Sequence, residues 1–173
     1  VGERVTSKGE VLQALDSEEL PALKDALLQR NYQSIAICLL FSFLHPEHEV
    51  KIAEALQQAG FFVSASHEVA PEYREYERMS TTVINSYVSP VLDHYLAQLE
   101  RAIHPDTHES FQLALQIMQS NGGILSLAEA RRFGVRCILS GPAGGIVGCQ
   151  HIARTCTRPS FSHQVITFDM GGT

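Results

Sequence analysis

The chain has 173 residues, of which 45% are hydrophobic, and its 19 acidic and 13 basic side chains give a formal net charge of −6. The sequence contains no run of five or more basic residues, so it lacks the positive patch with which proteins bind the phosphates of DNA or RNA. Its longest apolar stretches are well short of the roughly 18 residues that a membrane span needs. We therefore expect a globular protein without a nucleic-acid or membrane partner.

The four cysteines do not follow the pattern of a disulfide framework. No two of them form a Cys-x-x-Cys pair, and Cys38 and Cys137 stand inside apolar runs, where a free thiol behaves as a small hydrophobic side chain. The polar first residues bear no resemblance to a secretory signal. This usage of cysteine is typical of reduced proteins, so we expect free thiols and a cytoplasmic location.

Residues 1–66 predict an α/β unit. The expected elements are two short strands with a turn at Lys8 and Gly9, a helix capped by Asp16 or Ser17, a strand over 34–43, a helix over 45–60 with Pro46 in its first turn and Gly60 past its end, and a strand over 61–66. The first helix has an apolar face that consists of Leu20, Leu23, Leu27 and Leu28. A strand, a helix and a strand at this spacing favour a parallel strand pair covered on both sides.

A long helix is expected over residues 72–103. Its apolar side chains recur every three or four positions on one face, namely Tyr76, Met79, Val83, Tyr87, Val91, Tyr95, Leu99 and Ile103. Pro90 interrupts the pattern, because its ring clashes with the carbonyl of Ser86 and it has no N–H to donate. We therefore expect either one kinked helix or two helices that meet near Ser89.

The remaining chain predicts shorter elements. They are a hairpin over 111–127 with its turn at Asn121, Gly122 and Gly123, a helix over 128–134 that Gly134 ends, a strand over 135–141, a helix over 142–155 that Pro142 starts, and a final strand over 164–172.

The final strand leads into the stretch "VITFDMGGT", residues 165–173, which has the character of a phosphate site. An apolar strand would place Asp169 at its end, where a carboxylate can hold Mg²⁺ directly or through water. Gly171 and Gly172 have no Cβ, so their N–H groups can approach a phosphate closely, and Thr173 could donate its hydroxyl. A plain β-turn that begins with Asp explains the same short string, and the pattern alone favours that turn.

The helix before this strand begins with "SGPAGG". This string resembles a phosphate loop at a helix N-terminus, but it lacks the Lys-Ser/Thr pair of a P-loop and the Gly-x-Gly-x-x-Gly spacing. Small residues instead give the helix a smooth face that another backbone could approach, and these are Ala143, Gly144, Gly145 and Gly148. We therefore favour an interdomain contact helix.

A small-residue helix followed by a strand that ends in Asp-x-Gly-Gly-Thr resembles the actin, sugar-kinase and heat-shock-ATPase superfamily. Within it, the sequence most resembles the hydantoinase A / 5-oxoprolinase family, which includes acetone carboxylase subunits. Four ordered motifs between Ile35 and Thr173 carry the resemblance, namely "AICLLFSFLHPEHE", "EYREYERMSTTVINSYVSPVL", "QIMQSNGGILSLAEAR" and "SGPAGGIVG".

The resemblance implies ATP-dependent opening of a cyclic amide such as a hydantoin or 5-oxoproline, through phosphorylation of the amide oxygen. It implies an α/β fold with part of an actin-like (ribonuclease H-like) lobe over residues 1–134, in which 72–103 form the helical segment. Residues 135–173 would then supply a hinge helix and the start of a second nucleotide-binding lobe. The implied ligands are ATP and Mg²⁺, and the implied partner is a hydantoinase B-type subunit or domain.

By position, the resemblance makes the terminal turn the second phosphate-binding turn, which comprises Asp169, Gly171, Gly172 and Thr173, with Asp169 toward Mg²⁺. The hinge helix would comprise Gly141, Ala143, Gly144, Gly145 and Gly148. It assigns no catalytic residue.

The family opens with another Asp-x-Gly-Gly-Thr-like hairpin, and none stands before Val165 here. We therefore expect a fragment of a larger two-lobe protein, inactive by itself. The alternatives are a non-catalytic partner-binding module with a degenerate nucleotide turn, an acetone carboxylase-type subunit and a sugar-kinase-like phosphotransferase.

Other conspicuous residues have plainer explanations. His45 and His48 could share a metal, but a helix start is favoured. The stretch "EYREYER", residues 72–78, is either a solvated helix start with ion pairs or a set of carboxylates for a substrate. Ser80, Thr81 and Thr82 would contact substrate or cap a helix segment. "QSNGG", residues 119–123, is a hairpin turn whose position leaves a cleft-lining role open.

Overall fold

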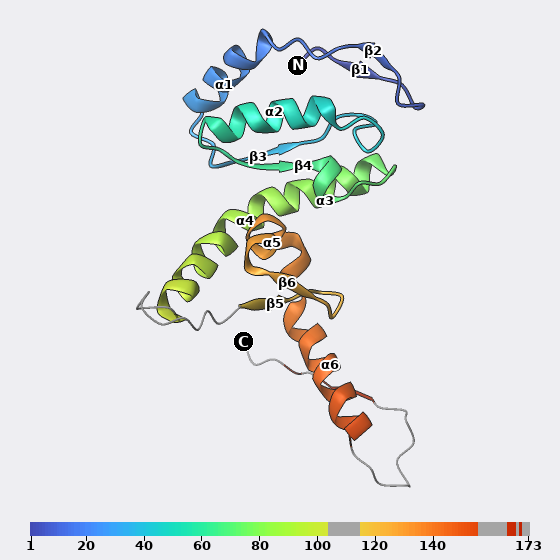
Figure 1. Ribbon diagram of the computed structural model, residues 1–173, viewed down its shortest axis with the longest axis vertical. Helices are drawn as coiled ribbons and strands as arrows, with labels where there is room; N and C mark the ends of the chain where they lie inside the picture. Colours follow the sequence, from blue (N-terminus) through green and yellow to red (C-terminus); the bar gives the residue numbers. More distant parts are fainter. Residues whose placement is uncertain (104–114, 156–165, 169, 171–173) are drawn as a thin grey trace, which may run out of the picture. The chain divides into compact units, whose positions relative to one another are not determined.

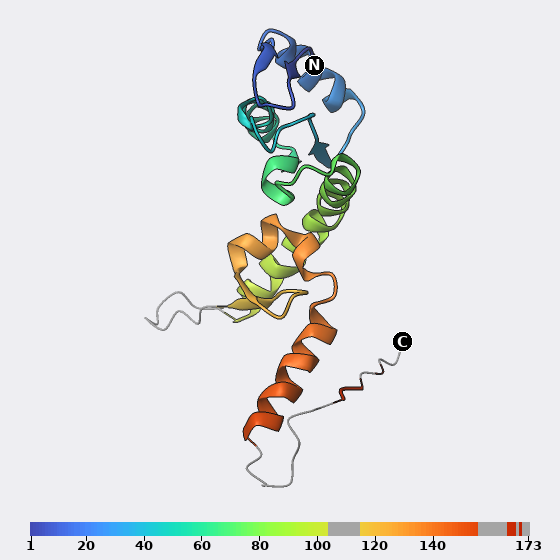
Figure 2. The same ribbon diagram turned by 90° about the vertical axis from the view of Figure 1, so that its right-hand side faces the viewer.

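The computed structural model describes residues 1–103, 115–155, 166–168 and 170, which form two compact units, Val1–His94 and Tyr95–Thr173 (Figures 1 and 2). The boundary between the units falls inside the long helix α4, Glu75–Ile103, so this helix contributes residues to both. The fold is of mixed helix and sheet, as the sequence predicts.

The first unit is built on a parallel strand pair. Its elements are β1 (Arg4–Val5), β2 (Val11–Gln13), α1 (Glu19–Gln29), β3 (Ser34–Ile37), α2 (Glu47–Gln58), β4 (Phe62–Ala65), α3 (Ser66–Val69) and the first part of α4. β1 and β2 pair antiparallel, whereas β3 and β4 pair parallel in a register that runs from Ser34 opposite Phe62 to Ile37 opposite Ala65. Figure 1 shows α2 on one side of β3 and β4 and the first part of α4 on the other. The predicted strand–helix–strand unit is confirmed.

The core of this unit lies where α1 and α2 meet the strand pair. Its buried members are Leu15, Ile37, Ile52, Ala53, Leu56, Phe61 and Ala65. Leu20, Leu23 and Leu27 of α1 pack against them, as their spacing predicts. Leu28 was expected on the same face but is half exposed, because it lies at the edge of the apolar stripe in the last turn of α1. That part of the prediction is wrong.

The ends of α2 agree with the predicted start and stop residues, whereas the start of α1 does not. Pro46 occupies the N-cap of α2, and Gly60 follows its end with φ of 90°, a conformation that glycine adopts without steric cost. Helix α1 begins at Glu19, later than either expected cap. The Asp16 carboxylate accepts a hydrogen bond from the Glu18 N–H at 2.9 Å, so it closes a turn before the helix instead of capping it.

Strand β3 is shorter than the apolar run predicts, and it ends at Ile37. Just beyond Ile37, side chains instead of a neighbouring strand form hydrogen bonds with the backbone. The Leu39 N–H donates to Glu49 Oε1 at 2.7 Å, and the Leu39 carbonyl accepts from Arg78 Nη2 at 2.8 Å. Because these groups are satisfied without a neighbouring strand, the chain turns away, and Phe41 adopts φ of 59°.

Helix α4 runs unbroken from Glu75 to Ile103 through Pro90, which agrees with the one-helix alternative. Its predicted apolar face is not the buried one. In the first unit the apolar stripe is exposed, and it consists of Tyr76, Met79, Val83, Tyr87 and Val91. The buried face of the same stretch is polar and consists of Arg78, Thr82, Asn85, Ser86 and Ser89. This face packs on the strand pair, where Asn85 Nδ2 donates to Ser64 Oγ at 2.9 Å.

The described part of the second unit contains a hairpin and three helical elements besides the end of α4. They are β5 (Gln116–Met118), β6 (Ile124–Ser126), α5 (Leu127–Arg132), the 3₁₀ helix η1 (Gly134–Cys137) and α6 (Ser140–Thr155). β5 and β6 pair antiparallel, so the predicted hairpin is confirmed for the described residues, which exclude 111–114. Ser126 and Glu129 form a reciprocal capping box that starts α5. Helix α6 confirms the predicted helix over 142–155 and begins at Ser140.

The strand expected over 135–141 is wrong. Residues Gly134–Cys137 form a 3₁₀ turn, and the chain then enters α6. The Arg136 carbonyl accepts from the Ser120 N–H at 2.7 Å and from Ser120 Oγ at 2.8 Å, so this backbone bonds to the hairpin turn. The final strand was predicted over residues 164–172. Its described residues Ile166, Thr167 and Phe168 are not in a strand.

The cysteines support a prediction about thiol reactivity. Within the described chain Cys38, Cys137 and Cys149 are free thiols, whereas Cys156 lies outside the described residues. Burial raises the pKa of Cys38 and of Cys137, because desolvation disfavours the thiolate. Cys149 is exposed.

We expect a thiol reagent at pH 8 to label Cys149 first and to label Cys38 and Cys137 more slowly, since the thiolate is the reactive form. Mass spectrometry of peptides from the native protein gives the order. Titration in denaturant without reductant should find four thiols, and a count of two or fewer would contradict the reduced state.

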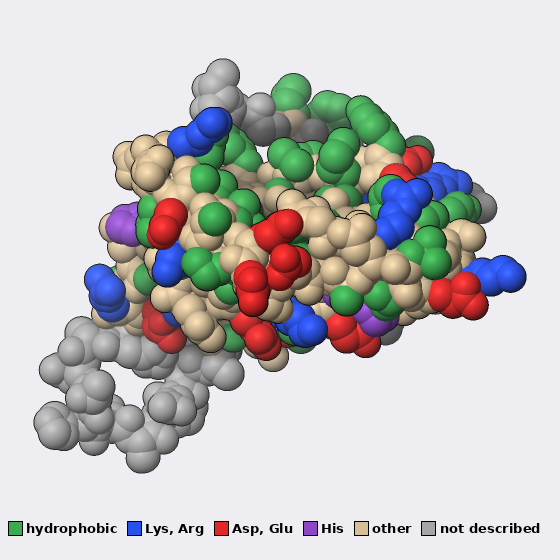
Figure 3. Space-filling model, turned by 90° about the horizontal axis from the view of Figure 1, so that it is seen from above, with side chains coloured by type: hydrophobic (Ala, Val, Ile, Leu, Met, Phe, Trp, Pro, Cys, Tyr) green, Lys and Arg blue, Asp and Glu red, His purple; other side chains and the backbone are tan. Residues whose placement is uncertain are grey.

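Figure 3 shows acidic, basic and hydrophobic side chains interspersed on the face seen from above. No helix within the described ranges combines the length and apolarity needed to cross a bilayer.

Candidate functional site

The predicted phosphate-binding turn lies outside the described residues. This holds for Asp169, Gly171, Gly172 and Thr173. Their roles toward phosphate and Mg²⁺ therefore stay predictions. Elsewhere in the described chain, no group of three or more His, Cys, Asp or Glu side chains is arranged to hold a metal ion.

The predicted hinge residues all lie on α6, and the structure leaves most of them uncovered. Among the described residues outside the helix's own backbone, a Cβ added at Gly141, Gly145 or Gly148 would meet no atom within 4 Å. A Cβ at Gly144 would lie 3.8 Å from Met118 Cγ of β5, which is an ordinary contact. Ala143 is half-buried in the first turns of the helix. The small-residue face is therefore available to another segment, and the hinge role stays a prediction.

Ser120 ties the hairpin turn to the chain that leads into α6. Its N–H and hydroxyl both donate to the Arg136 carbonyl, and its Oγ accepts from the Leu139 N–H at 3.2 Å. Within the turn, the Gly123 N–H donates to Asn121 Oδ1 at 2.9 Å, and Gly122 has φ of 83°. The conformation of "QSNGG" is thus fixed by its own hydrogen bonds and by those to η1.

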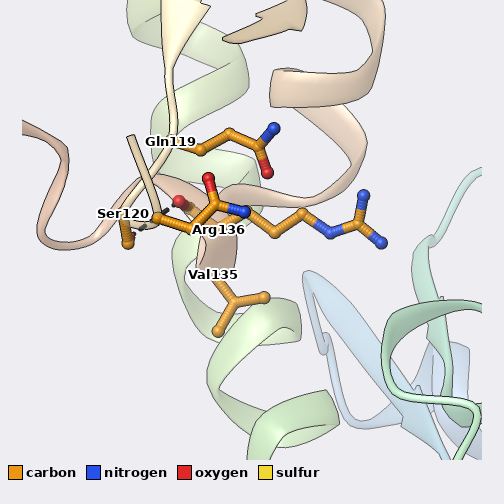
Figure 4. Close-up of a pocket in the computed structure, with 5 residues that line it drawn as sticks. Gln119, Ser120, Val135 and Arg136 are labelled. Carbon is orange, nitrogen blue, oxygen red and sulfur yellow. Dashed lines mark hydrogen bonds between the residues drawn. The ribbon is translucent and has the colours of Figure 1, made fainter. Parts of the chain in front are cut away.

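This turn lines an open pocket of about 390 Å³ within the second unit (Figure 4). The lining residues are Gln119, Ser120, Asn121, Val135 and Arg136. The close-up shows the side chains of Gln119 and Arg136 extending from the turn and from η1 toward the same side. The cleft-lining role that the sequence left open for "QSNGG" is therefore supported, and Arg136 is a pocket residue that sequence reasoning missed.

Positive charge gathers beside this pocket. The guanidinium groups of Arg136 and Arg132 lie 4.4 Å and 5.4 Å from the centroid of the Phe133 ring. The nearby carboxylate of Glu129 is engaged in the capping box, and hydrogen bonds from Ser126 together with the charge of Arg136 lower its pKa. The pocket therefore has a cationic wall.

A second polar cluster lies in the first unit, at the carboxyl ends of β3 and β4. Glu49 is fully buried and accepts four hydrogen bonds. The donors are the Leu39 N–H at 2.7 Å, Ser66 Oγ at 2.7 Å, the His67 N–H at 2.9 Å and His67 Nδ1 at 2.8 Å. Such a carboxylate holds the β3 and β4 ends together. The sequence indicated only an acid in the first turn of a helix, so this role was missed.

Arg78 joins the same region from α4. It is fully buried and donates to Ser42 Oγ, to the Leu39 carbonyl and to the Glu75 carboxylate, with its guanidinium 5.5 Å from the Phe43 ring centroid. The solvated alternative for "EYREYER" is therefore wrong for Arg78.

The solvated alternative for "EYREYER" holds for Arg74 and Glu77, whose side chains are more than half exposed and lie 3.6 Å apart. Thr81 and Thr82 donate their hydroxyls to backbone carbonyls four residues earlier, within α4. They cap no helix segment.

The histidines of "HPEHE" are structural. His48 Nε2 accepts a hydrogen bond from the Leu15 N–H at 3.3 Å, so the ring proton is on Nδ1, which lies 2.8 Å from the Glu3 carboxylate. Both nitrogens of His48 are thus used, and His45 pairs with Glu47 at 3.0 Å. The favoured helix-start interpretation is confirmed.

The sequence profile of the hydantoinase/oxoprolinase family matches residues 78–173, and that of the family's N-terminal region matches residues 1–60. The chain belongs to the hydantoinase/oxoprolinase family. The resemblance indicated by the four ordered motifs is thereby confirmed.

The caprolactamase subunit alpha of Pseudomonas jessenii is one relative of this chain. The two are 34% identical over an alignment of 176 residues, which covers 100% of this chain and 24% of that protein. The 5-oxoprolinase of Saccharomyces cerevisiae is 34% identical over 167 residues, 94% of this chain and 12% of that protein. A crystal structure of ATP-dependent caprolactamase from Pseudomonas jessenii superposes with a TM-score of 0.77 at 32% identity, covering 88% of this chain and 22% of that one. The chain thus spans a quarter or less of these relatives.

Proposed function

We propose that this family member is part of an ATP-dependent hydrolase that opens cyclic amides. The observation that carries the proposal is that the chain aligns over nearly its whole length with both a caprolactamase subunit and a 5-oxoprolinase. Caprolactam and 5-oxoproline differ in ring size and charge, but both are cyclic amides. The shared chemistry is therefore cleavage of a ring C–N bond.

In the proposed reaction ATP phosphorylates the amide oxygen, which makes the ring carbon a better electrophile. Water then adds to that carbon, the C–N bond breaks, and the ring opens with release of ADP and phosphate. Such a reaction suits a site that holds the γ-phosphate across a closing cleft.

The proposed nucleotide contacts are the backbone N–H groups of Gly171 and Gly172, the Thr173 hydroxyl and the Asp169 carboxylate. Carboxylate oxygen is the ligand that Mg²⁺ prefers, so Asp169 suits the metal, either directly or through water. Helix α6 would act as the hinge helix. Its uncovered glycines support this role, because they leave room for a second backbone.

We further propose that residues 1–134 belong to an actin-like lobe with its helical segment, and residues 135–173 to the hinge helix and the start of the second lobe. The name of the caprolactamase subunit implies that this relative works with another subunit. We propose a hydantoinase B-type partner, and the cysteine usage supports a cytoplasmic location.

The test is release of phosphate from MgATP by the intact protein with its partner subunit, with 5-oxoproline, hydantoin or caprolactam added. We expect hydrolysis that depends on one of the cyclic amides, with one phosphate released for each ring opened. ATP hydrolysis that no cyclic amide stimulates would contradict the proposal.

Two alternatives give distinct results in the same assay. The acetophenone carboxylase gamma subunit of Aromatoleum aromaticum is 26% identical over the whole chain, so stimulation by a ketone with bicarbonate would identify a carboxylase. Absence of Mg²⁺-dependent nucleotide binding would identify a non-catalytic module.

A further inference from the structure

The pocket lined by the hairpin turn and η1 has the composition of an anion site. Within the described chain, the Arg136 guanidinium has the Phe133 ring as its neighbour and no carboxylate within ion-pair distance. Arginine offers five N–H donors in a planar fork that matches a carboxylate or a phosphate. This group therefore has donors left for a ligand.

Neither of the two acids described beside this wall forms an ion pair with Arg136. Glu129 bonds to Ser126 in the capping box, and Glu100 lies 2.8 Å from the guanidinium of Arg131. Arg132 adds a second cation beside Phe133. In a chain with a net charge of −6, this is a local excess of positive charge. An anion is consequently the ligand class that the wall favours.

The amide side chains supply orientation. Gln119 Nε2 donates to the Ile124 carbonyl at 3.3 Å, which fixes the side chain beside Arg136 and leaves its Oε1 as an acceptor (Figure 4). Asn121 Oδ1 accepts from the Gly123 N–H, so its Nδ2 group remains a donor. Because Ser120 fixes the turn on η1, these groups are preorganised.

We propose that this pocket binds the oxyanion of a small molecule, with Arg136 as the bidentate donor and Asn121 as a second donor to the oxyanion, and with Gln119 accepting from an N–H or O–H group elsewhere on that molecule. A volume of about 390 Å³ is in the range of small-molecule sites. The anion is either a carboxylate, as on the ring of 5-oxoproline, or a phosphate group. The proposal rests on the proposed function only for the choice of probes.

Calorimetry on the intact protein tests the proposal with three probes. They are 5-oxoproline, 2-pyrrolidinone, which is the same ring without the carboxylate, and inorganic phosphate. We expect Arg136→Gln to weaken binding of at least one anion about tenfold or more, because charge-assisted bidentate bonds are lost. Affinity for 2-pyrrolidinone should not change, and Arg136→Lys should recover only part of the loss.

Arg101→Gln is the matched control, since it removes the same charge from an exposed residue in the last turn of α4 that does not line the pocket. Its effect should stay within about twofold. Loss of 5-oxoproline binding alone identifies a substrate carboxylate, whereas loss of phosphate binding alone identifies a phosphoryl group.

The proposal is overturned if the wild type binds neither anion, if Arg136→Gln leaves both affinities unchanged, or if Arg101→Gln has an equal effect. An unchanged thermal midpoint in Arg136→Gln shows that the variant is folded. If anion binding depends on Arg136 but no cyclic amide stimulates ATP hydrolysis, the proposed function fails and the pocket stands.

Discussion

Replacing Asp169 by Asn in the intact protein should lower ATP turnover about 100-fold or more, the scale observed when one preorganised charge-stabilising group is removed. The variant keeps the shape of the side chain but removes the charge that would hold Mg²⁺ on the β- and γ-phosphates. Stability should change little if the proposed turn holds, since a turn residue contributes little core packing.

Turnover and thermal midpoint measured on the same sample separate the phosphate site from a plain turn. If Asp169 only starts a β-turn, the variant loses some stability and keeps nearly normal turnover. A rate within threefold of wild type would therefore remove Asp169 from the nucleotide site. Asp25→Asn is the control, because Asp25 is exposed on α1, and it should change neither quantity.

The second large effect should follow Glu49→Gln, which we expect to destabilise the protein by about 1.5–3 kcal/mol, the scale of losing hydrogen bonds to a buried charged group. Glu49 is fully buried and accepts hydrogen bonds from Leu39, Ser66 and His67. The amide of Gln directs an NH₂ group at one of these donors, which leaves two buried donors facing each other.

Urea unfolding measures this free energy, and Glu54→Gln is the matched control. Glu54 lies on the same helix but is exposed, so its replacement should stay within about 0.5 kcal/mol of wild type. A loss below 1 kcal/mol for Glu49→Gln would show that the carboxylate cluster does not hold the strand ends together.

The sequence predicted elements well where the signals were local. Pro46 and Gly60 bound α2 because proline at a helix start and glycine after its end act through their own backbone preferences. The β5–β6 hairpin likewise follows from its Asn-Gly-Gly turn. Family membership could be predicted because four motifs occur in the family's order. A single motif would not have been specific enough.

Prediction failed where side chains distant in sequence decide the structure. Strand β3 ends early because Glu49 and Arg78 satisfy the backbone of Leu39, and no periodicity reveals that pairing. The strand expected over 135–141 failed similarly, because Ser120 bonds to the Arg136 carbonyl. For the same reason the sequence pointed to the "QSNGG" side of the pocket and missed Arg136.

The periodicity of the sequence also could not predict which face of α4 is buried. Spacing shows that a helix has an apolar side, but it does not show which side its own unit covers. Here the strand pair covers the side with hydrogen-bonding groups, such as Asn85 on Ser64, and the apolar stripe faces outward.

This outward stripe has a consequence for the colloidal behaviour of the 173-residue chain. Tyr76, Tyr87 and Val91 are each at least 70% exposed along one helix face, and contiguous apolar surface of this kind makes molecules attract one another in water. That attraction strengthens with sulfate or phosphate salts and weakens with urea. The exposed stripe of α4 therefore lowers the solubility of the isolated chain, and sulfate should lower it further.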